Sequence, residues 1–299
     1  RKSFSINKDI KSATLYVTAH GMYEAYLNGE RVGNAYYTPG WTSYHKRLQY
    51  QVYDVTDILQ QNNAIGVIMG NGWYRGFLGF GKGQKNNRYG NDIALFLQIE
   101  IDYTDGSHER IVSDPTWKSS TGKITYSEIY HGEKHDLRLE KEGWMLPGYD
   151  DTQWFGVTVA DYGTANLTGT ISEPVREHEV FKPVRIFTTP KGEKVIDFGQ
   201  NIAGWVRMKV KGNVGDSITL SHAEVLDPAG NFYTKNLRSA KAQCAYTLNS
   251  SDSVILHPHF TWHGFRYLKI ENYPGEIKPE NFEAVALYSS LETTGNFTS

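Results

Sequence analysis

The chain has 299 residues, with 31 basic and 33 acidic side chains and a formal net charge of −2. This length can bury a sizeable core, and at roughly 100 to 200 residues per domain it predicts two domains. The charge is close to balance and no block of like charge occurs, which argues against nucleic acid and anionic membranes as partners.

Cys244 is the only cysteine, so an intramolecular disulfide bond is excluded and the fold depends on core packing and strand pairing. This cysteine content fits the cytosol and also permits the periplasm, so the compartment stays open. No run of 18 apolar residues occurs, and we therefore expect no segment that crosses a bilayer.

The first half of the chain alternates apolar and polar residues, a pattern typical of half-buried strands. It predicts strands at residues 13–19, 23–27, 48–55, 64–69, 93–103 and 109–113. Asn28-Gly29 and Asp105-Gly106 predict hairpin turns, because both residue types in each pair tolerate positive φ. Helix signals are weak, and only Thr56–Gln60 predicts a single capped turn.

The second half predicts further strands at residues 195–198, 206–210, 217–223, 245–248, 265–270 and 284–288. We expect an all-β protein of two β-sandwich domains in series, jelly-roll-like, with immunoglobulin-like topology as the alternative. The alternation lapses between residues 160 and 180, where the segment 161–170 is small and polar. The boundary is therefore expected near Thr170, giving domains 1–169 and 170–299.

Short ordered motifs in both halves carry a resemblance. Those of the first half are Asn28–Gly33, Pro39–Arg47, Tyr53–Thr56 and Gly70–Gly76. Those of the second half are Asp197–Asn201, Gly204-Trp205, Ala223–Leu226, Gly230–Tyr233, Asn236–Ser239 and Phe260–Tyr267. In this order, across almost the whole chain, they resemble the amino-terminal module and the following sandwich domain of bacterial α-L-rhamnosidases, glycoside hydrolase family 78.

The resemblance implies an enzyme that hydrolyses terminal α-L-rhamnosyl units with inversion, using one carboxylic acid and one carboxylate on a helical barrel. No motif of that barrel occurs in this chain, so we expect no catalytic residue here. Glu128, Glu133 and Asp136 are expected to be surface charges, turn caps or ion-pair partners. The two domains would brace the barrel; the alternative is a free-standing carbohydrate-binding or structural module.

Some related modules are similar in binding rhamnose through calcium held near the Gly-Asn-Gly-Trp turn. Asn71 stands where the resemblance often places an aspartate. Its amide supplies one oxygen and no charge, so any calcium held at Asn71 should bind weakly. No other cofactor is expected.

The sugar-binding candidates are residues at this turn and in the polar loop 86–92: Asn71, Trp73, Tyr74, Arg75, Asn91 and Asp92. Sugars need hydroxyl partners and an aromatic plate for their apolar face, and these side chains supply both. The expected ligand is a rhamnose-containing oligosaccharide or glycoside.

Two aromatic positions have competing interpretations. Trp73 adjoins an apolar strand, and we favour a place for it in the core beside a tight glycine turn over a sugar contact. Trp41 and Tyr44 follow the turn signal Pro39-Gly40, and we favour a role for them in capping the sandwich over ligand stacking.

In the second domain, Arg266 is expected to form a forked pair with Asp197 or Glu224, because a lone charge between apolar strand residues is unfavourable. His222, His257, His259 and His263 lie on strand-like segments without a clustered set of ligands. We expect no zinc site there.

Overall fold

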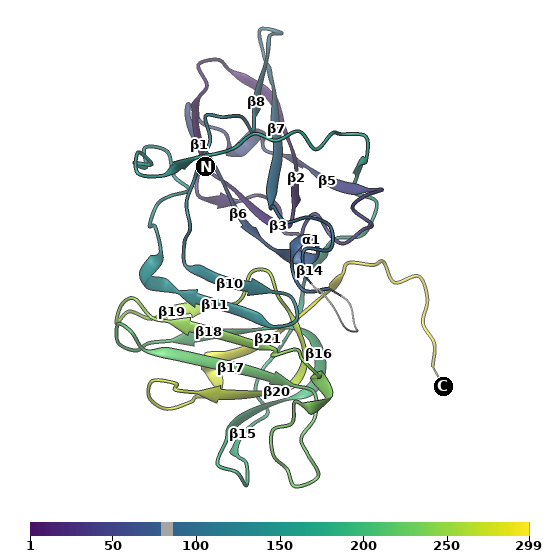
Figure 1. Ribbon diagram of the computed structural model, residues 1–299, viewed down its shortest axis with the longest axis vertical. Helices are drawn as coiled ribbons and strands as arrows, with labels where there is room; N and C mark the ends of the chain where they lie inside the picture. The colour runs from purple at the N-terminus through teal and green to yellow at the C-terminus, as the bar shows by residue number, and fades with distance from the viewer. Residues whose placement is uncertain (79–85, 299) are drawn as a thin grey trace. The chain divides into compact units, whose positions relative to one another are not determined.

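The computed structural model describes residues 1–78 and 86–298 and forms two compact units (Figure 1). The first unit contains Arg1–Lys123 and Leu139–Thr170, and the second contains Ile124–Arg138 and Ile171–Ser299. The chain therefore leaves the first unit once, at residue 124, before its final exit after Thr170. Residues 124–138, expected in the first domain, pair instead with strands of the second unit.

The first unit contains two main sheets. The five-stranded sheet has the order β13 (Leu167–Gly169), β5 (Leu48–Asp54), β2 (Ile10–His20), β7 (Ala94–Tyr103) and β8 (His108–Val112). The four-stranded sheet has the order β1 (Lys2–Ser5), β6 (Asn62–Gly70), β3 (Met22–Leu27) and β4 (Glu30–Arg31). A short pair joins β9 (Lys118–Ser119) to β12 (Phe155–Gly156).

The core of the first unit follows from the alternation along β2 and β7, which pair antiparallel (Figure 1). Leu15 lies opposite Ile99 and Val17 opposite Leu97, and all four side chains are at most 1% exposed. They pack in one cluster with apolar residues of the four-stranded sheet, including Leu27. Each fully buried side chain of this kind stabilises the fold by about 1.5–3 kcal/mol.

Both predicted hairpins form, but by different turns. Asn28 and Gly29 both have positive φ, 54° and 87°, in the two-residue turn between β3 and β4. In the turn between β7 and β8 only Gly106 has positive φ, at 82°. There the Asp105 carboxylate instead accepts a hydrogen bond from the Ser107 amide at 2.8 Å.

The second unit is one network of ten strands. Its main path runs through β10 (Ile124–Glu128), β11 (Gly132–Asp136), β18 (Gln243–Thr247), β17 (Ser217–Ala223), β20 (His263–Glu271), β16 (Lys194–Val210), β21 (Phe282–Ser289) and β14 (Val175–Phe181). Two more strands, β15 (Arg185–Thr188) and β19 (Val254–Leu256), pair with β16. Phe265, Phe282 and Tyr246 are each 0% exposed in its core. The expected all-β class is confirmed in both units.

Helices are short among the described residues. They are α1 (Gly72–Arg75) and the 3₁₀ turns η1 (Thr56–Ile58), η2 (Leu137–Leu139), η3 (Lys235–Leu237) and η4 (Pro279–Asn281). Thus η1 lies within the turn expected at Thr56–Gln60, but the expected cap is wrong: Val55 is the N-cap residue and no side chain makes a capping hydrogen bond. Thr56 Oγ1 instead accepts from the Ala13 amide of β2 at 2.9 Å. Within residues 1–78 and 86–298 no helix has the length and apolar character needed to cross a membrane.

The segments predicted as separate strands at 195–198 and 206–210 are two parts of the single strand β16. The pairing of β16 with β20 shifts register between Asp197 and Ile202, which marks a bulge. Beyond it, Gly204 pairs with Ala286 of β21 and His263 of β20, so both neighbouring backbones approach closely. A Cβ atom on Gly204 would overlap the carbonyl oxygen of Val285.

Replacing Gly204 by alanine should therefore lower the free energy of unfolding by about 1–3 kcal/mol, the usual effect of overpacking. The matched control is Gly122→Ala, where an added Cβ meets no atom within 4 Å. Urea denaturation followed by circular dichroism measures both variants. Equal midpoints for the two would contradict the close approach of β16 and β21.

Candidate functional site

Three strands of the first unit begin or end at the same end of its five-stranded sheet, and their connecting loops meet there. β2 finishes at His20, which pairs with Ala94 at the start of β7. β5 begins nearby in the same sheet at Leu48. Leu48 packs with Tyr74 of α1 and with Tyr44, so the loops that precede β5 and β7 meet the turn that follows β6.

A glycine allows that turn. Gly72 has φ +53°, and a Cβ atom there would lie 2.7 Å from Cγ of Met22 in β3. Asn71 precedes it, and the Asn71 carbonyl accepts a hydrogen bond from the Arg75 amide at 3.2 Å. The Arg75 carbonyl in turn accepts from the Asn87 amide at 2.8 Å. The α1 turn is thereby tied to the polar loop of residues 86–92.

Aromatic rings surround α1. Tyr74 is 8% exposed and stacks on His20, with ring centroids 4.3 Å apart and planes 8° apart. Its ring also lies 5.5 Å from Tyr44 and 6.3 Å from Tyr89. Tyr74 is one of the six residues expected to contact sugar, but protein encloses its ring. Its position suits it to hold the adjacent Trp73 in place.

Trp73 and Trp41 form a parallel pair with centroids 6.1 Å apart and planes 9° apart. Trp73 is half-buried, whereas Trp41 is 53% exposed. Tyr44, 3% exposed, donates to the Gly40 carbonyl at 2.8 Å and fits the expected capping role. Trp41 differs from that expectation, because half of its surface faces solvent. The pair presents a partly open aromatic surface.

Polar residues also lie at the end of α1 and before β7. Asn91 and Asp92 are exposed in the residues before β7, and Arg75 at the end of α1 is half-buried. Asp92 lies close enough to act on Tyr74: burial raises the pKa of Tyr74, and the charges of Tyr162 and Asp92 add to the increase. Aromatic side chains combined with amide, carboxylate and guanidinium groups can bind a polyhydroxylated ring.

The donor set suits calcium only weakly. Asn71 offers an amide oxygen and Asp92 a carboxylate, whereas calcium takes six to eight oxygen ligands. Throughout residues 1–78 and 86–298, no group of three or more His, Cys, Asp and Glu side chains is placed to hold a metal ion.

In the second unit the expected forked pair is confirmed. Arg266 Nε and Nη2 donate to the two carboxylate oxygens of Asp197 at 2.7 and 2.9 Å. Burial opposes ionisation of Asp197, but this pair and the Gly199 amide hold the pKa of its carboxyl below its usual value. The Glu224 carboxylate instead accepts a hydrogen bond from the side-chain amide of Asn236 at 3.3 Å. The pair satisfies both charges where the two strands meet, as the structural interpretation expects.

The three acids expected to be non-catalytic have structural partners or are buried. Asp136 pairs with Arg138 at 2.7 Å. Glu133 lies 2.7 Å from His135 Nε2, but it is only 1% exposed. Its carboxylate also accepts from the backbone amides of His259 and Phe260 at 2.8 and 2.5 Å. Glu128 is likewise buried, at 6% exposed, so neither glutamate is a surface charge.

Two of the four histidines considered for zinc, His222 and His263, pack against each other in the core of the second unit. His222 and His263 have centroids 4.4 Å apart, and His263 Nε2 lies 3.9 Å from Cys244 Sγ. His222 Nδ1 lies 2.9 Å from the Ala242 carbonyl, to which it can donate. Burial lowers the pKa of His222 to about 4 and raises the pKa of the Cys244 thiol to about 12. A thiol in this state is an inert packing group.

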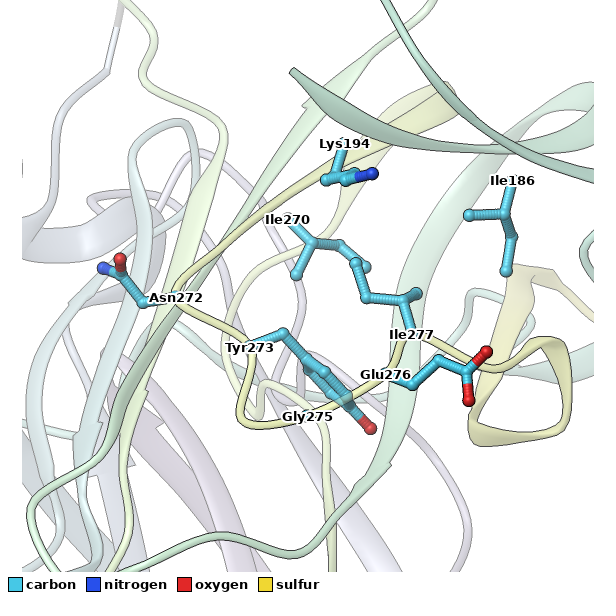
Figure 2. Close-up of a pocket in the computed structure, with 8 residues that line it drawn as sticks. All are labelled: Ile186, Lys194, Ile270, Asn272, Tyr273, Gly275, Glu276 and Ile277. Atoms are coloured by element: carbon cyan, nitrogen blue, oxygen red, sulfur yellow. The ribbon is translucent and has the colours of Figure 1, made fainter. Parts of the chain in front are cut away.

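An open hollow of about 490 Å³ lies elsewhere in the second unit (Figure 2). Figure 2 shows Ile186, Ile270 and Ile277 along it, with Lys194 and Glu276 among the eight residues that line it. Lys194 Nζ donates to Thr188 Oγ1 at 2.8 Å. With one carboxylate among its lining residues, the hollow lacks the pair of acids that glycoside hydrolysis uses.

Comparisons with known proteins agree with the motifs. Residues 8–179 match the α-L-rhamnosidase N-terminal domain, and residues 187–288 match the bacterial α-L-rhamnosidase concanavalin-like domain. An α-L-rhamnosidase of Streptomyces avermitilis is 42% identical over 295 residues, covering 97% of this chain and 28% of that protein. One of Formosa agariphila is 34% identical over 308 residues, covering 100% of this chain and 32% of that protein. The chain thus spans about a third of these relatives.

Solved structures show the same similarity. The α-L-rhamnosidase of Aspergillus terreus superposes with a TM-score of 0.94 at 41% identity, covering 97% of this chain and 34% of that one. The Streptomyces avermitilis enzyme in complex with L-rhamnose superposes with a TM-score of 0.92 at 39% identity, covering 97% and 28%.

The buried histidines make the stability of the chain dependent on pH. Burial lowers the pKa of both His222 and His263, so in mild acid the unfolded state, with a histidine pKa of about 6.5, binds more protons. The contribution of these two histidines to stability should be constant above that pH and should fall below it, by up to about 1.4 kcal/mol per pH unit for each histidine. For His222 the loss extends to about pH 4.

Urea denaturation at a series of pH values from 7 to 4.5 measures this slope. His222→Gln should reduce the slope by up to one proton relative to the unchanged protein. Parallel stability profiles for the two proteins would show that His222 is not held neutral by burial.

Proposed function

Because the chain belongs to the α-L-rhamnosidase family, we propose that it is the non-catalytic β-sandwich part of an enzyme that hydrolyses terminal α-L-rhamnosyl residues with inversion. The observation that carries this proposal is the ordered match of two rhamnosidase domains to 8–179 and 187–288, in a chain about a third as long as its relatives. The barrel that carries the catalytic pair would be the remaining part of the parent protein.

The state of the acids supports a non-catalytic role. An inverting glycosidase needs a general acid with a raised pKa and a second carboxylate about 6.5–9.5 Å away. The carboxyl groups with shifted pKa in the described part of the chain shift downward, because hydrogen bonds and cations stabilise their charge. Examples are Glu133, Asp197 and Glu283. None of these three suits the role of the proton donor.

The chain on its own should give no turnover of an aryl α-L-rhamnoside, because the acid pair lies outside it. Release of the aryl group, followed by absorbance at high protein concentration, measures this. Hydrolysis that a single Asp or Glu substitution abolishes would contradict the proposal, since it would place the catalytic pair in this chain.

For the first unit we propose a sugar contact at the end of its sandwich, built from the Trp41–Trp73 pair and the polar residues Asn71, Arg75 and Asp92. The exposed face of Trp41 and the half-buried ring of Trp73 offer an aromatic plate for the apolar face of a pyranose. Tyr74 would hold Trp73 in place from the buried cluster against which Trp73 packs. The ligand would be a rhamnosyl unit, the sugar bound by the related Streptomyces avermitilis structure.

Calcium is a further part of this proposal. Bound at Asn71, it would hold sugar hydroxyls in its coordination shell. The binding would be weak because Asn71 contributes no charge.

Calorimetric titration tests the contact. L-rhamnose should release heat with the unchanged chain, and Trp73→Ala should weaken the affinity about tenfold or more, which equals about 1.4 kcal/mol. Phe155→Ala, which removes an aromatic ring that is 76% exposed in β12, is the matched control and should leave the affinity unchanged.

The same titration after chelation tests the calcium component. Binding that needs calcium and is lost in Asn71→Ala would support a calcium-linked contact at Asn71. No heat at millimolar rhamnose would contradict sugar binding and would leave both units as scaffolding.

The alternative function is a free-standing carbohydrate-binding module. The partly open tryptophan pair favours binding over a purely structural role, but it does not require a linked hydrolase. The reading frame of the gene separates the two proposals. Several hundred further residues with helical periodicity would support the hydrolase, and a stop codon directly after this chain would support the free-standing module.

A further inference from the structure

His20, the last residue of β2, lies beside the turn that forms the candidate site. In β2 the side chains of Leu15, Val17 and Ala19 belong to the core of the first unit, so the alternation turns His20 to the other side of the sheet. Its backbone is held by the pairing with Ala94 at the start of β7. The register of β2 with β7 therefore sets the position of the His20 ring.

Two tyrosine rings enclose the His20 ring. Tyr74 of α1 stacks on it with centroids 4.3 Å apart and planes 8° apart, and Tyr162 meets it edge-on at 4.6 Å. This stack is closer than the contacts of Tyr74 with Tyr44 and Tyr89, whose centroids are 5.5 and 6.3 Å away. His20 is thus the ring that supports Tyr74 most directly.

The His20 ring has a buried polar atom. Its Nδ1 has no hydrogen-bond partner within residues 1–78 and 86–298. A neutral imidazole can carry its proton on Nε2 and leave Nδ1 as an acceptor, whereas a protonated imidazole has an N–H at both positions. A buried N–H without an acceptor is unfavourable. The ordered arrangement of the rings therefore requires the neutral form of His20.

The groups around His20 do not stabilise its charged form. Tyr74 and Tyr162 contact it from α1 and from the segment before β13, and Asp92, before β7, acts on Tyr74. Burial raises the pKa of Tyr74, so its hydroxyl is neutral wherever a histidine titrates. Burial also lowers the pKa of His20, and within the described part of the chain no carboxylate offsets this.

Tyr74 links His20 to the tryptophan pair. Trp73 follows Tyr74 in the same turn and packs against the buried cluster to which Tyr74 belongs. Trp73 lies parallel to Trp41, with centroids 6.1 Å apart. A protonated His20 must leave its place to find an acceptor for its Nδ1–H, and its stack with Tyr74 is then lost. Trp73 would lose part of the support that orders it.

We propose that His20 is a pH-sensitive positioning residue of the sugar contact. The neutral ring holds Tyr74, and through it Trp73, in the arrangement that binds sugar, and the protonated ring leaves the stack. This inference rests on the proposed contact at Trp41 and Trp73. The apparent affinity for L-rhamnose then follows the fraction of neutral His20. It should be constant above the ordinary histidine pKa of about 6.5 and should fall at lower pH, by up to about tenfold per pH unit.

Calorimetric titration of L-rhamnose from pH 7.5 to 4.5, at one calcium concentration, tests the proposal. The unchanged chain should lose affinity at the acid end. His20→Phe keeps a flat ring for the stack but takes up no proton, so its affinity should be independent of pH. The matched control is His45→Gln, because His45 is exposed and contacts Tyr89 at 5.2 Å. This variant should lose affinity in acid as the unchanged chain does. Circular dichroism confirms that each protein is folded at each pH.

Nuclear magnetic resonance of the unchanged chain provides a test without a variant. The signal of the Trp73 indole N–H should shift with pH at the same midpoint as the signals of the His20 ring. A Trp73 signal that does not follow His20 would overturn the proposal, because the two rings would then be uncoupled.

Measurable binding with an affinity that is constant over the whole pH range would overturn the role of His20 and leave the sugar contact intact. A loss of affinity in acid that His20→Phe shares, or that His45→Gln removes, would assign the effect to another group and would also overturn the proposal. No heat at any pH would instead overturn the sugar contact, and the role of His20 with it.

Discussion

The antiparallel pairing of β2 with β7 is the constraint on which the first unit depends. Because side chains alternate between the two sides of a strand, one register sends Leu15, Val17, Leu97 and Ile99 into the core. The same register sends Tyr16 and Phe96 outward and ends the pair at His20 and Ala94, beside α1. A slip of one residue would turn the core side chains outward and Tyr16 and Phe96 inward. The core of the first unit and the position of α1 beside the sheet are therefore two consequences of one pairing.

The strongest periodic segments were predictable from the sequence. Residues 93–103 alternate over their whole length, and β7 occupies 94–103. The pattern was weaker where tertiary contacts decide the structure. The hairpin of β10 and β11 is held by the parallel pairing of β11 with β18 and by Glu133. The buried Glu133 carboxylate accepts hydrogen bonds from the backbone amides of His259 and Phe260, more than 120 positions away in sequence. Local alternation carries no information about such a partner, and for that reason the hairpin was assigned to the first domain.

The candidate site shows the same division. Glycines and aromatic residues around Asn71 marked the turn, and the structure places Trp73 half-buried and Tyr74 buried within it. The exposure of Trp41 was not predictable, because a turn followed by an aromatic residue is compatible with both a cap and a binding surface. Its parallel arrangement with Trp73 depends on two loops more than 30 residues apart in sequence. The forked pair of Arg266 with Asp197 was predictable, since few partners can stabilise a guanidinium between apolar strand residues.

We propose that the first unit binds a rhamnosyl sugar at the tryptophan pair. Nuclear magnetic resonance of the indole N–H groups of the seven tryptophans during titration with L-rhamnose tests this. The signals of Trp41 and Trp73 should shift, whereas those of Trp117 and Trp205, 4% and 0% exposed, should not. Unchanged signals for Trp41 and Trp73 at saturating rhamnose would contradict the claim.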